Sequence, residues 1–276
     1  MHPISIAAEK IFTLFGFLPV TNSLLTTWLV MALLITLGYL AGRKVKKVPS
    51  GLQNLFEMLF EWLLGMIEMF TGDKKKAREF FVYAVTIFIF ILFSNWMGLI
   101  PGVGSIGFFE EEVGIGEIAA ESAVEGAVAT KAIDGVAEAA AAEHETEFVP
   151  LFRAGSSDLS FTLALALATI LYVQYCGIKH LRLGYFKKFI NFTGPIQFFV
   201  GLLEIVSEFA KIVSFSFRLF GNIFAGEVLL VVMLFLAPYI VPIPFYGLEV
   251  FVGLVQSLVF MALTLVFLSS ATSSHH

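Results

Sequence analysis

Six ionisable residues lie within the two long apolar segments nearest the C-terminus of this 276-residue chain: Glu204, Glu208, Lys211, Arg218, Glu227 and Glu249. Apolar segments of this length are typical of membrane spans. On insertion scales an Arg, Lys or Asp at the centre of a bilayer costs about 2.5–3.5 kcal/mol, so these groups must face protein, water or one another. Ionisable residues in this setting mark, by default, a path for ions or protons.

The spacing of these residues gathers most of them on one side of a helix. With Arg218 at zero and about 100° per residue, the polar side chains before and just after it fall between about −40° and +80°. They are Glu204, Ser207, Glu208, Lys211, Ser214 and Asn222. Glu227 falls on the opposite side, whereas Glu249 and Gln256 share a face of the last segment within about 60°. We therefore expect two polar faces on neighbouring helices to line a common aqueous cavity.

Two interpretations of Glu204, Glu208 and Lys211 stay open. They either line the path or simply pair with one another at helix-neighbour spacing near a membrane interface. Arg218 is different, because none of its neighbours three or four positions away is acidic: Ser214, Phe215, Gly221 and Asn222. The counter-charge of Arg218 is therefore expected to come from elsewhere.

The composition assigns the chain to a class. Apolar residues make up 58% and charged residues 14%, whereas soluble domains carry about 25% charge. This excludes an ordinary soluble enzyme, a disordered chain and a nucleic-acid-binding protein. The single cysteine, Cys176, excludes a disulfide framework and a cysteine-based metal cluster. We find no phosphate loop, metal-ligand cluster or nucleophile–base motif, so we predict neither a cofactor nor catalysis by this chain alone.

Five apolar segments are expected to form helices of an all-α polytopic membrane protein. They are Leu24–Gly42, Phe80–Ile100, Leu159–Gly177, Ile196–Ala237 and Phe245–Ser270. At 1.5 Å per residue the fourth segment is roughly 63 Å long, about twice the hydrocarbon thickness. It is either two spans with a tight break or one helix that lies far from the membrane normal.

The distribution of Lys and Arg predicts the orientation. Residues 43–79 contain eight of them and residues 179–194 contain four, whereas residues 102–157 contain two against eleven acidic residues. By the positive-inside rule the first two stretches are cytoplasmic and the acidic loop is external. Residues 1–23 are then an external N-terminal segment, which lacks the features of a cleaved signal, and the C-terminus is cytoplasmic.

Two segments are not expected to span the membrane. Leu52–Phe70 places Glu57, Glu61 and Glu68 within about 40° of one another, which predicts an amphipathic helix on the cytoplasmic surface. It either rests on lipid or binds a partner subunit. Glu117–Glu145 is rich in Ala and Glu and is expected to be a solvated helix or a disordered acidic loop.

Residues Ser214–Glu227 read S-F-S-F-R-L-F-G-N-I-F-A-G-E. This stretch resembles the signature of the a subunit of F-type ATP synthases, the stationary proton-channel subunit of their membrane sector. Four other segments are similar to parts of that family: Thr21–Val30, Ser94–Pro101, Asp158–Leu167 and Gln256–Leu268. The resemblance does not extend to the acidic loop, so no function is transferred to it.

The resemblance implies roles for individual residues. Arg218 matches the family's essential arginine, and Glu227 and Glu249 match a pair of polar positions near the outer half-channel. Asn222 and Gln256 would orient water or Arg218. Further residues would line the half-channels, with Asp158 at the outer entrance: Asp158, Ser214, Glu204, Glu208 and Lys211.

The resemblance also implies an architecture and partners. Residues 196–273 would form a strongly tilted helical hairpin that faces a rotating ring of c subunits. The other partners would be the peripheral-stalk b subunits, the rest of the complex and membrane lipid, in a bacterial inner membrane. The alternatives are a secondary transporter, which should show an internal repeat that we do not find, and a cation channel, for which acidic rings are more typical than a lone Arg.

Overall fold

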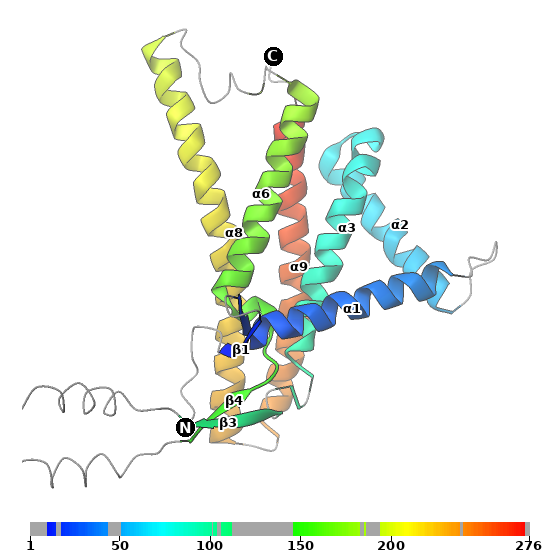
Figure 1. The fold of residues 1–276 in the computed structure, drawn as a ribbon. Helices are drawn as coiled ribbons and strands as arrows, with labels where there is room; N and C mark the ends of the chain where they lie inside the picture. Colours follow the sequence, from blue (N-terminus) through cyan, green and yellow to red (C-terminus); the bar gives the residue numbers. More distant parts are fainter. Residues whose placement is uncertain are drawn as a thin grey trace, which may run out of the picture.

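The computed structural model describes residues 10–14, 18–43, 51–100, 102–103, 106–111, 146–182, 185, 194–237 and 240–273 (Figure 1). Helices dominate this part of the chain: α1 (Asn22–Gly42), α2 (Leu52–Thr71), α3 (Lys74–Met97), α6 (Leu159–Leu181), α8 (Pro195–Leu236) and α9 (Pro242–Thr272). All except α2 are long and apolar enough to cross a membrane. The prediction of an all-α polytopic membrane protein is confirmed.

Helix α8 is continuous over its 42 residues. It is therefore one long helix, and the alternative of two spans with a tight break is wrong. Pro195 stands at its first turn, where the missing N–H would have no helical partner anyway. A short connection then leads to Pro242, which begins α9 in the same way. Helices α8 and α9 thus form the predicted long C-terminal hairpin.

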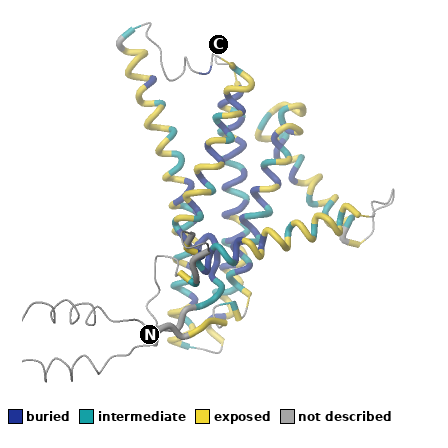
Figure 2. The backbone as a smooth tube through the Cα atoms, viewed as in Figure 1, coloured by how far each residue is buried: buried dark blue, intermediate teal, exposed yellow. Residues whose placement is uncertain are grey.

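The core lies among α3, α6 and α9 (Figure 2). Phe80 and Phe88 of α3 pack with Val173 of α6 and with Met261 and Leu265 of α9, and all five are buried. The N-terminal half of α8 diverges from α6, and α1 extends to the opposite side at a steep angle to α3 and α9 (Figure 1). Large apolar side chains of α1 and of this part of α8 are correspondingly exposed, as expected of surfaces that contact lipid or another membrane protein.

Helix α2 has the predicted amphipathic character. Its buried side chains Leu63 and Ile67 join the α3 core, while Glu57 and Glu61 are exposed. Gly72, with φ of 65°, ends the helix in the left-handed conformation, which glycine adopts without a steric penalty.

Polar contacts fix the two ends of the bundle. At one end Lys179 of α6 lies 2.8 Å from Glu79 of α3, and Lys76 Nζ donates to the carbonyl of Thr272 in α9 at 3.2 Å. At the other end the segment that precedes α6 contacts the start of α1. The basic residues at the start of α3 and the end of α6 therefore share one end of the bundle, as the Lys and Arg distribution requires. The membrane side of each end stays a prediction.

Two pairs of short antiparallel strands were not predicted. β1 (Lys10–Leu14) pairs with β2 (Leu18–Thr21), and β3 (Gly107–Glu111) pairs with β4 (Thr146–Pro150), each in antiparallel register. β3 and β4 are separated by residues 112–145, so no short turn motif in the sequence indicates that they pair. The Ala- and Glu-rich stretch lies outside the described residues.

Candidate functional site

The polar stripe predicted on α8 lines a cavity between α8 and α9. This cavity, of about 240 Å³, is bordered by Ser207, Lys211, Ser214 and Arg218 from α8 and by Leu263 and Phe267 from α9. Successive α8 side chains of this set are three or four positions apart, which places them on one face. The structure thus brings together the part of the stripe that ends at Arg218.

Arg218 lies on an open side of α8. Its Nη2 donates to Ser214 Oγ at 3.3 Å, and within the described ranges no acidic side chain forms an ion pair with it. Ser214, Gly221 and Asn222 beside it are exposed, and a Cβ placed on Gly221 would have no neighbour within 4 Å. The guanidinium therefore has a hydroxyl partner from its own helix and room for an anion from outside the chain.

Asn222 and Gln256 connect the two polar faces. Asn222 Nδ2 donates to Gln256 Oε1 at 2.8 Å, one turn from Arg218. Gln256 is only 4% exposed, and its Nε2 has no hydrogen-bond partner in the described part of the chain. A buried amide donor without a partner is costly, so this position is suited to a water molecule or a transient partner.

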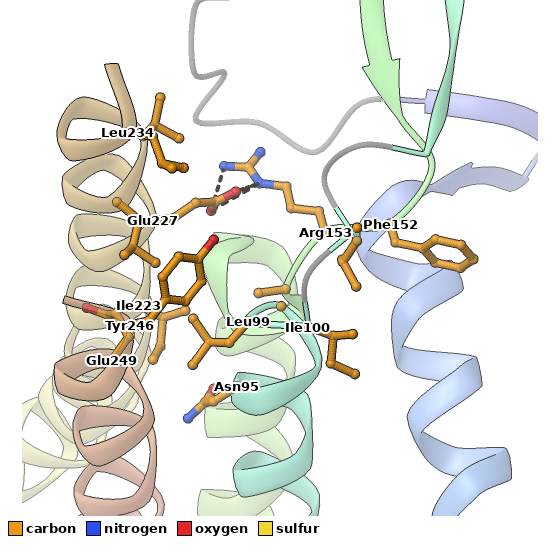
Figure 3. Close-up of a pocket in the computed structure, with 16 residues that line it drawn as sticks. Asn95, Leu99, Ile100, Phe152, Arg153, Ile223, Glu227, Leu234, Tyr246 and Glu249 are labelled. Carbon is orange, nitrogen blue, oxygen red and sulfur yellow. Dashed lines mark hydrogen bonds and ion pairs between the residues drawn. The ribbon is translucent and has the colours of Figure 1, made fainter. Parts of the chain in front are cut away.

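A second cavity lies farther along α8, beyond Arg218 (Figure 3). It has a volume of about 290 Å³ and is lined in part by Asn95 of α3, Arg153, Glu227 of α8, and Tyr246 and Glu249 of α9. The predicted pair Glu227 and Glu249 is thus brought to one cavity. Glu227 lies nine positions after Arg218, about 13 Å along the helix.

Glu249 is buried beside a glycine. It is 6% exposed, and its carboxyl group lies so close to Gly226 that a Cβ at that position would overlap it. In the described segments Glu249 has no hydrogen bond or ion pair. The close approach of α9 to α8 at this point requires a residue without a side chain.

Sequence reasoning missed the partner of Glu227. Arg153 Nε lies 3.3 Å from Glu227 Oε1, and its Nη2 donates to Oε2 at 3.5 Å (Figure 3). Arg153 comes from the segment between β4 and α6. Its only sequence signal is that it is one of two basic residues in the acidic loop 102–157.

Asp158 caps a helix. Oδ1 accepts from the backbone N–H of Ser160 at 2.9 Å, and Oδ2 accepts from Ser23 Oγ at 2.7 Å. The residue is buried and is not among those that line the cavity of Glu227. These contacts give Asp158 a structural task at the junction of α1 and α6, and its place at a channel entrance stays a prediction.

Two of the charged residues in the N-terminal half of α8, Glu208 and Lys211, contact each other. Lys211 Nζ lies 2.7 Å from Glu208 Oε1 and 4.9 Å from the centre of the Phe267 ring. The contact of Lys211 with Glu208 is the kind that the structural interpretation expects, but Lys211 also lines the cavity of Arg218, so both interpretations stay open. Burial, together with the negative charges of Glu208 and Glu204, raises the pKa of Tyr185 to about 12. The Tyr185 hydroxyl therefore stays protonated at physiological pH.

The fold and these cavities define a multi-pass membrane protein with ionisable residues buried between its last two helices. The chain matches the family described as ATP synthase A chain over residues 24–269. It is 32% identical over 271 residues to ATP synthase subunit a of Helicobacter pylori (strain Shi470), which covers 95% of this chain and 96% of the relative. It is 32% identical over 269 residues to the subunit a of Helicobacter hepaticus (strain ATCC 51449 / 3B1), with the same coverage of both chains. The chain therefore belongs to the ATP synthase A chain family, and the resemblance inferred from Ser214–Glu227 is confirmed.

Proposed function

We propose that the chain is the stationary proton-channel subunit of an F-type ATP synthase. Two offset aqueous half-channels and Arg218 couple proton translocation to rotation of a ring of c subunits. The observation that carries the proposal is the setting of Arg218, which lies on an open face of a long apolar helix. No acidic side chain of the described chain neutralises it. The guanidinium is therefore available to pair with a negative charge on a moving neighbour.

The coupling follows from the cost of charge in lipid. A ring carboxylate that faces lipid must be protonated, because a bare charge there is costly. Close to Arg218 the ionised form is favoured by the opposite charge. Arginine suits this task because it remains protonated when desolvated, whereas lysine can lose its proton. Lys211 is therefore no substitute.

The two cavities are candidates for the two half-channels. Glu227 and Glu249, with Asn222 and Gln256 between them and Arg218, belong to the outer half-channel. Ser214 and Lys211 begin the inner one. The fixed charge of Arg218 lies at the end of the inner cavity that is nearest to the outer one, and it opposes direct passage of a proton. A proton must then ride the ring from one cavity to the other.

The inner half-channel continues toward the N-terminal half of α8, where Glu204 and Glu208 line its exit. Each proton that crosses 100 mV releases about 2.3 kcal/mol. Synthesis of one ATP therefore requires several protons.

The lengths of the helices support a tilted arrangement. α1 has 21 residues and suits an upright span, whereas α8 at 42 residues exceeds the bilayer about twofold unless it is tilted. Since α1 lies at a steep angle to α3 and α9 (Figure 1), an upright α1 leaves the hairpin of residues 196–273 steeply inclined. Its exposed apolar face then lies against the c-ring.

The remaining partners and the location follow from the same proposal. The exposed side of α2 is the candidate contact surface for the peripheral-stalk b subunits. The host membrane is the bacterial inner membrane. The N-terminus lies outside and the C-terminus in the cytoplasm. ATP chemistry belongs to other subunits, and this chain is not an enzyme on its own.

The decisive experiment replaces Arg218 in the whole complex. In inverted vesicles, Arg218→Ala abolishes ATP-driven acidification and leaves a passive proton leak. Arg78→Ala, which removes an exposed arginine at the start of α3, serves as the matched control and acidifies normally. Normal acidification by Arg218→Ala would refute the proposal and favour a transporter or channel. Copurification of a small two-helix ring protein with the chain would separately support it.

A further inference from the structure

The ion pair between Arg153 and Glu227 distinguishes the two acidic residues of the second cavity, because Glu227 has a cationic partner and Glu249 has none in the described residues. We propose that Arg153 is a positioning residue of the outer half-channel: it holds Glu227 in a permanent ion pair and leaves Glu249 as the carboxyl group that takes up and releases the proton. This inference rests on the proposed function. The proposed function gives Glu227 and Glu249 the same role, whereas the inference gives them different roles.

The burial of Arg153 makes the pair persistent. The Arg153 side chain is 6% exposed and that of Glu227 is 32% exposed. A buried guanidinium that loses its anion is strongly destabilising, because an uncompensated charge then remains in a medium of low dielectric constant. Protonation of Glu227 would remove the carboxylate charge that the Arg153 guanidinium contacts. Glu227 is therefore a poor carrier, although it lies at the more accessible edge of the cavity.

The backbone of Arg153 is fixed from two sides. Its N–H donates to Thr26 Oγ1 of α1 at 3.1 Å. The next residue, Ala154, is buried against Gly98 at the end of α3. The guanidinium is thus presented to α8 from a segment that α1 and α3 hold in place, which is what a positioning residue requires.

Glu249 has the complementary properties. It is buried, and in the described residues no cation and no hydrogen-bond donor contacts its carboxyl group. Tyr246 and Asn95 line the same cavity, which gives a proton a polar route past it. A buried carboxyl group without a cation is stable when protonated and can ionise as the proton moves on. The carrier role therefore falls to Glu249.

The test is a double-mutant cycle in the intact ATP synthase, measured as ATP-driven acidification of inverted vesicles. Arg153→Gln and Glu227→Gln each remove one charge of the pair and keep the other, and each lowers the rate by about tenfold. The combined substitution removes both charges and is at least threefold faster than either single variant, because coupled residues are not additive. Arg153→Lys retains a cation and loses less than Arg153→Gln. Glu249→Gln remains slow in every background.

Two outcomes would overturn the proposal. If the double variant is as slow as Glu227→Gln, Glu227 carries the proton itself. If Arg153→Gln acidifies at the wild-type rate, the ion pair positions nothing. The amount of assembled complex in the membrane normalises each rate. If Arg153→Gln alone does not assemble, the positioning role is tested by comparing the rate of Glu227→Gln with that of the double variant. A double variant that also fails to assemble refutes the positioning role. Arg218→Ala in the same vesicles tests the proposed function separately, because it alone produces a leak.

Discussion

Asn222 of α8 and Gln256 of α9 are joined by a 2.8 Å hydrogen bond that crosses the hairpin one turn from Arg218. This bond is the point at which the two polar faces meet. On one side of it lies the cavity of Arg218, and on the other lies the cavity of Glu227 and Glu249.

Replacement of Gln256 by Leu tests this junction. The change leaves the Asn222 amide without its acceptor, which costs about 1–3 kcal/mol if the amide becomes buried. It also removes the polar group between the cavity of Glu249 and Arg218. We expect ATP-driven acidification to fall about tenfold without a leak. Gln256→Glu, which keeps an acceptor for Asn222, should be less impaired, and equal rates for the two variants would argue against a role of the hydrogen bond.

Arg218→Lys tests the need for a guanidinium. Lysine keeps a positive charge but can release its proton in an apolar setting, so coupling is expected to fail much as it does in Arg218→Ala. The measurement is ATP-driven acidification together with passive proton permeability. A coupled Arg218→Lys enzyme would show that any cation suffices here.

Gly226→Ala should slow proton flux because the new methyl group occupies the place of the Glu249 carboxyl group. We expect the shorter Glu249→Asp to relieve the collision, so the double variant should be faster than Gly226→Ala alone. Gly38→Ala is the matched control, since a Cβ at this helical position of α1 has no neighbour within 4 Å. An unimpaired Gly226→Ala variant would mean that the Glu249 side chain has another position available.

Substitutions of the two acids should slow flux without uncoupling. Glu227→Gln and Glu249→Gln each remove a carboxyl group from the cavity that both residues line, while Arg218 stays in place. We expect slower acidification, and passive permeability that remains far below that of Arg218→Ala. A leak of the same size in either variant would contradict the assignment of the barrier to Arg218.

Asp158→Ala distinguishes a structural role from a channel role. Loss of an N-cap costs about 0.5–2 kcal/mol, and loss of the contact with Ser23 adds to this. We expect a lower thermal stability of the detergent-solubilised complex, with a proton flux per assembled complex close to normal. If flux falls while stability is unchanged, the sequence-based placement of Asp158 at the channel entrance is supported instead.

Much of the fold could be predicted because its signals are local. Twenty consecutive apolar residues indicate a helix by themselves, and the period of Glu57, Glu61 and Glu68 indicates the amphipathic helix α2. The stripe from Ser207 to Arg218 likewise follows from helical periodicity alone.

The contacts that were missed join distant parts of the chain. Arg153 meets Glu227 across 74 positions, and the pairing of β3 with β4 spans the acidic stretch 112–145. Neither leaves a periodic pattern. Asp158 was assigned from its match to a family segment, whereas its observed contacts are those of a helix cap, which a position directly before an apolar run can also indicate.

The unbroken course of α8 has a mechanical consequence. Ser207, Arg218 and Glu227 belong to one continuous helix, so the axial distance between the two cavities is set by residue number rather than by loop geometry. A single residue inserted between Arg218 and Glu227 would turn one relative to the other by about 100° and separate them by about 1.5 Å. We therefore expect the register of this helix to set the distance between the proposed entry and exit sites of the proton.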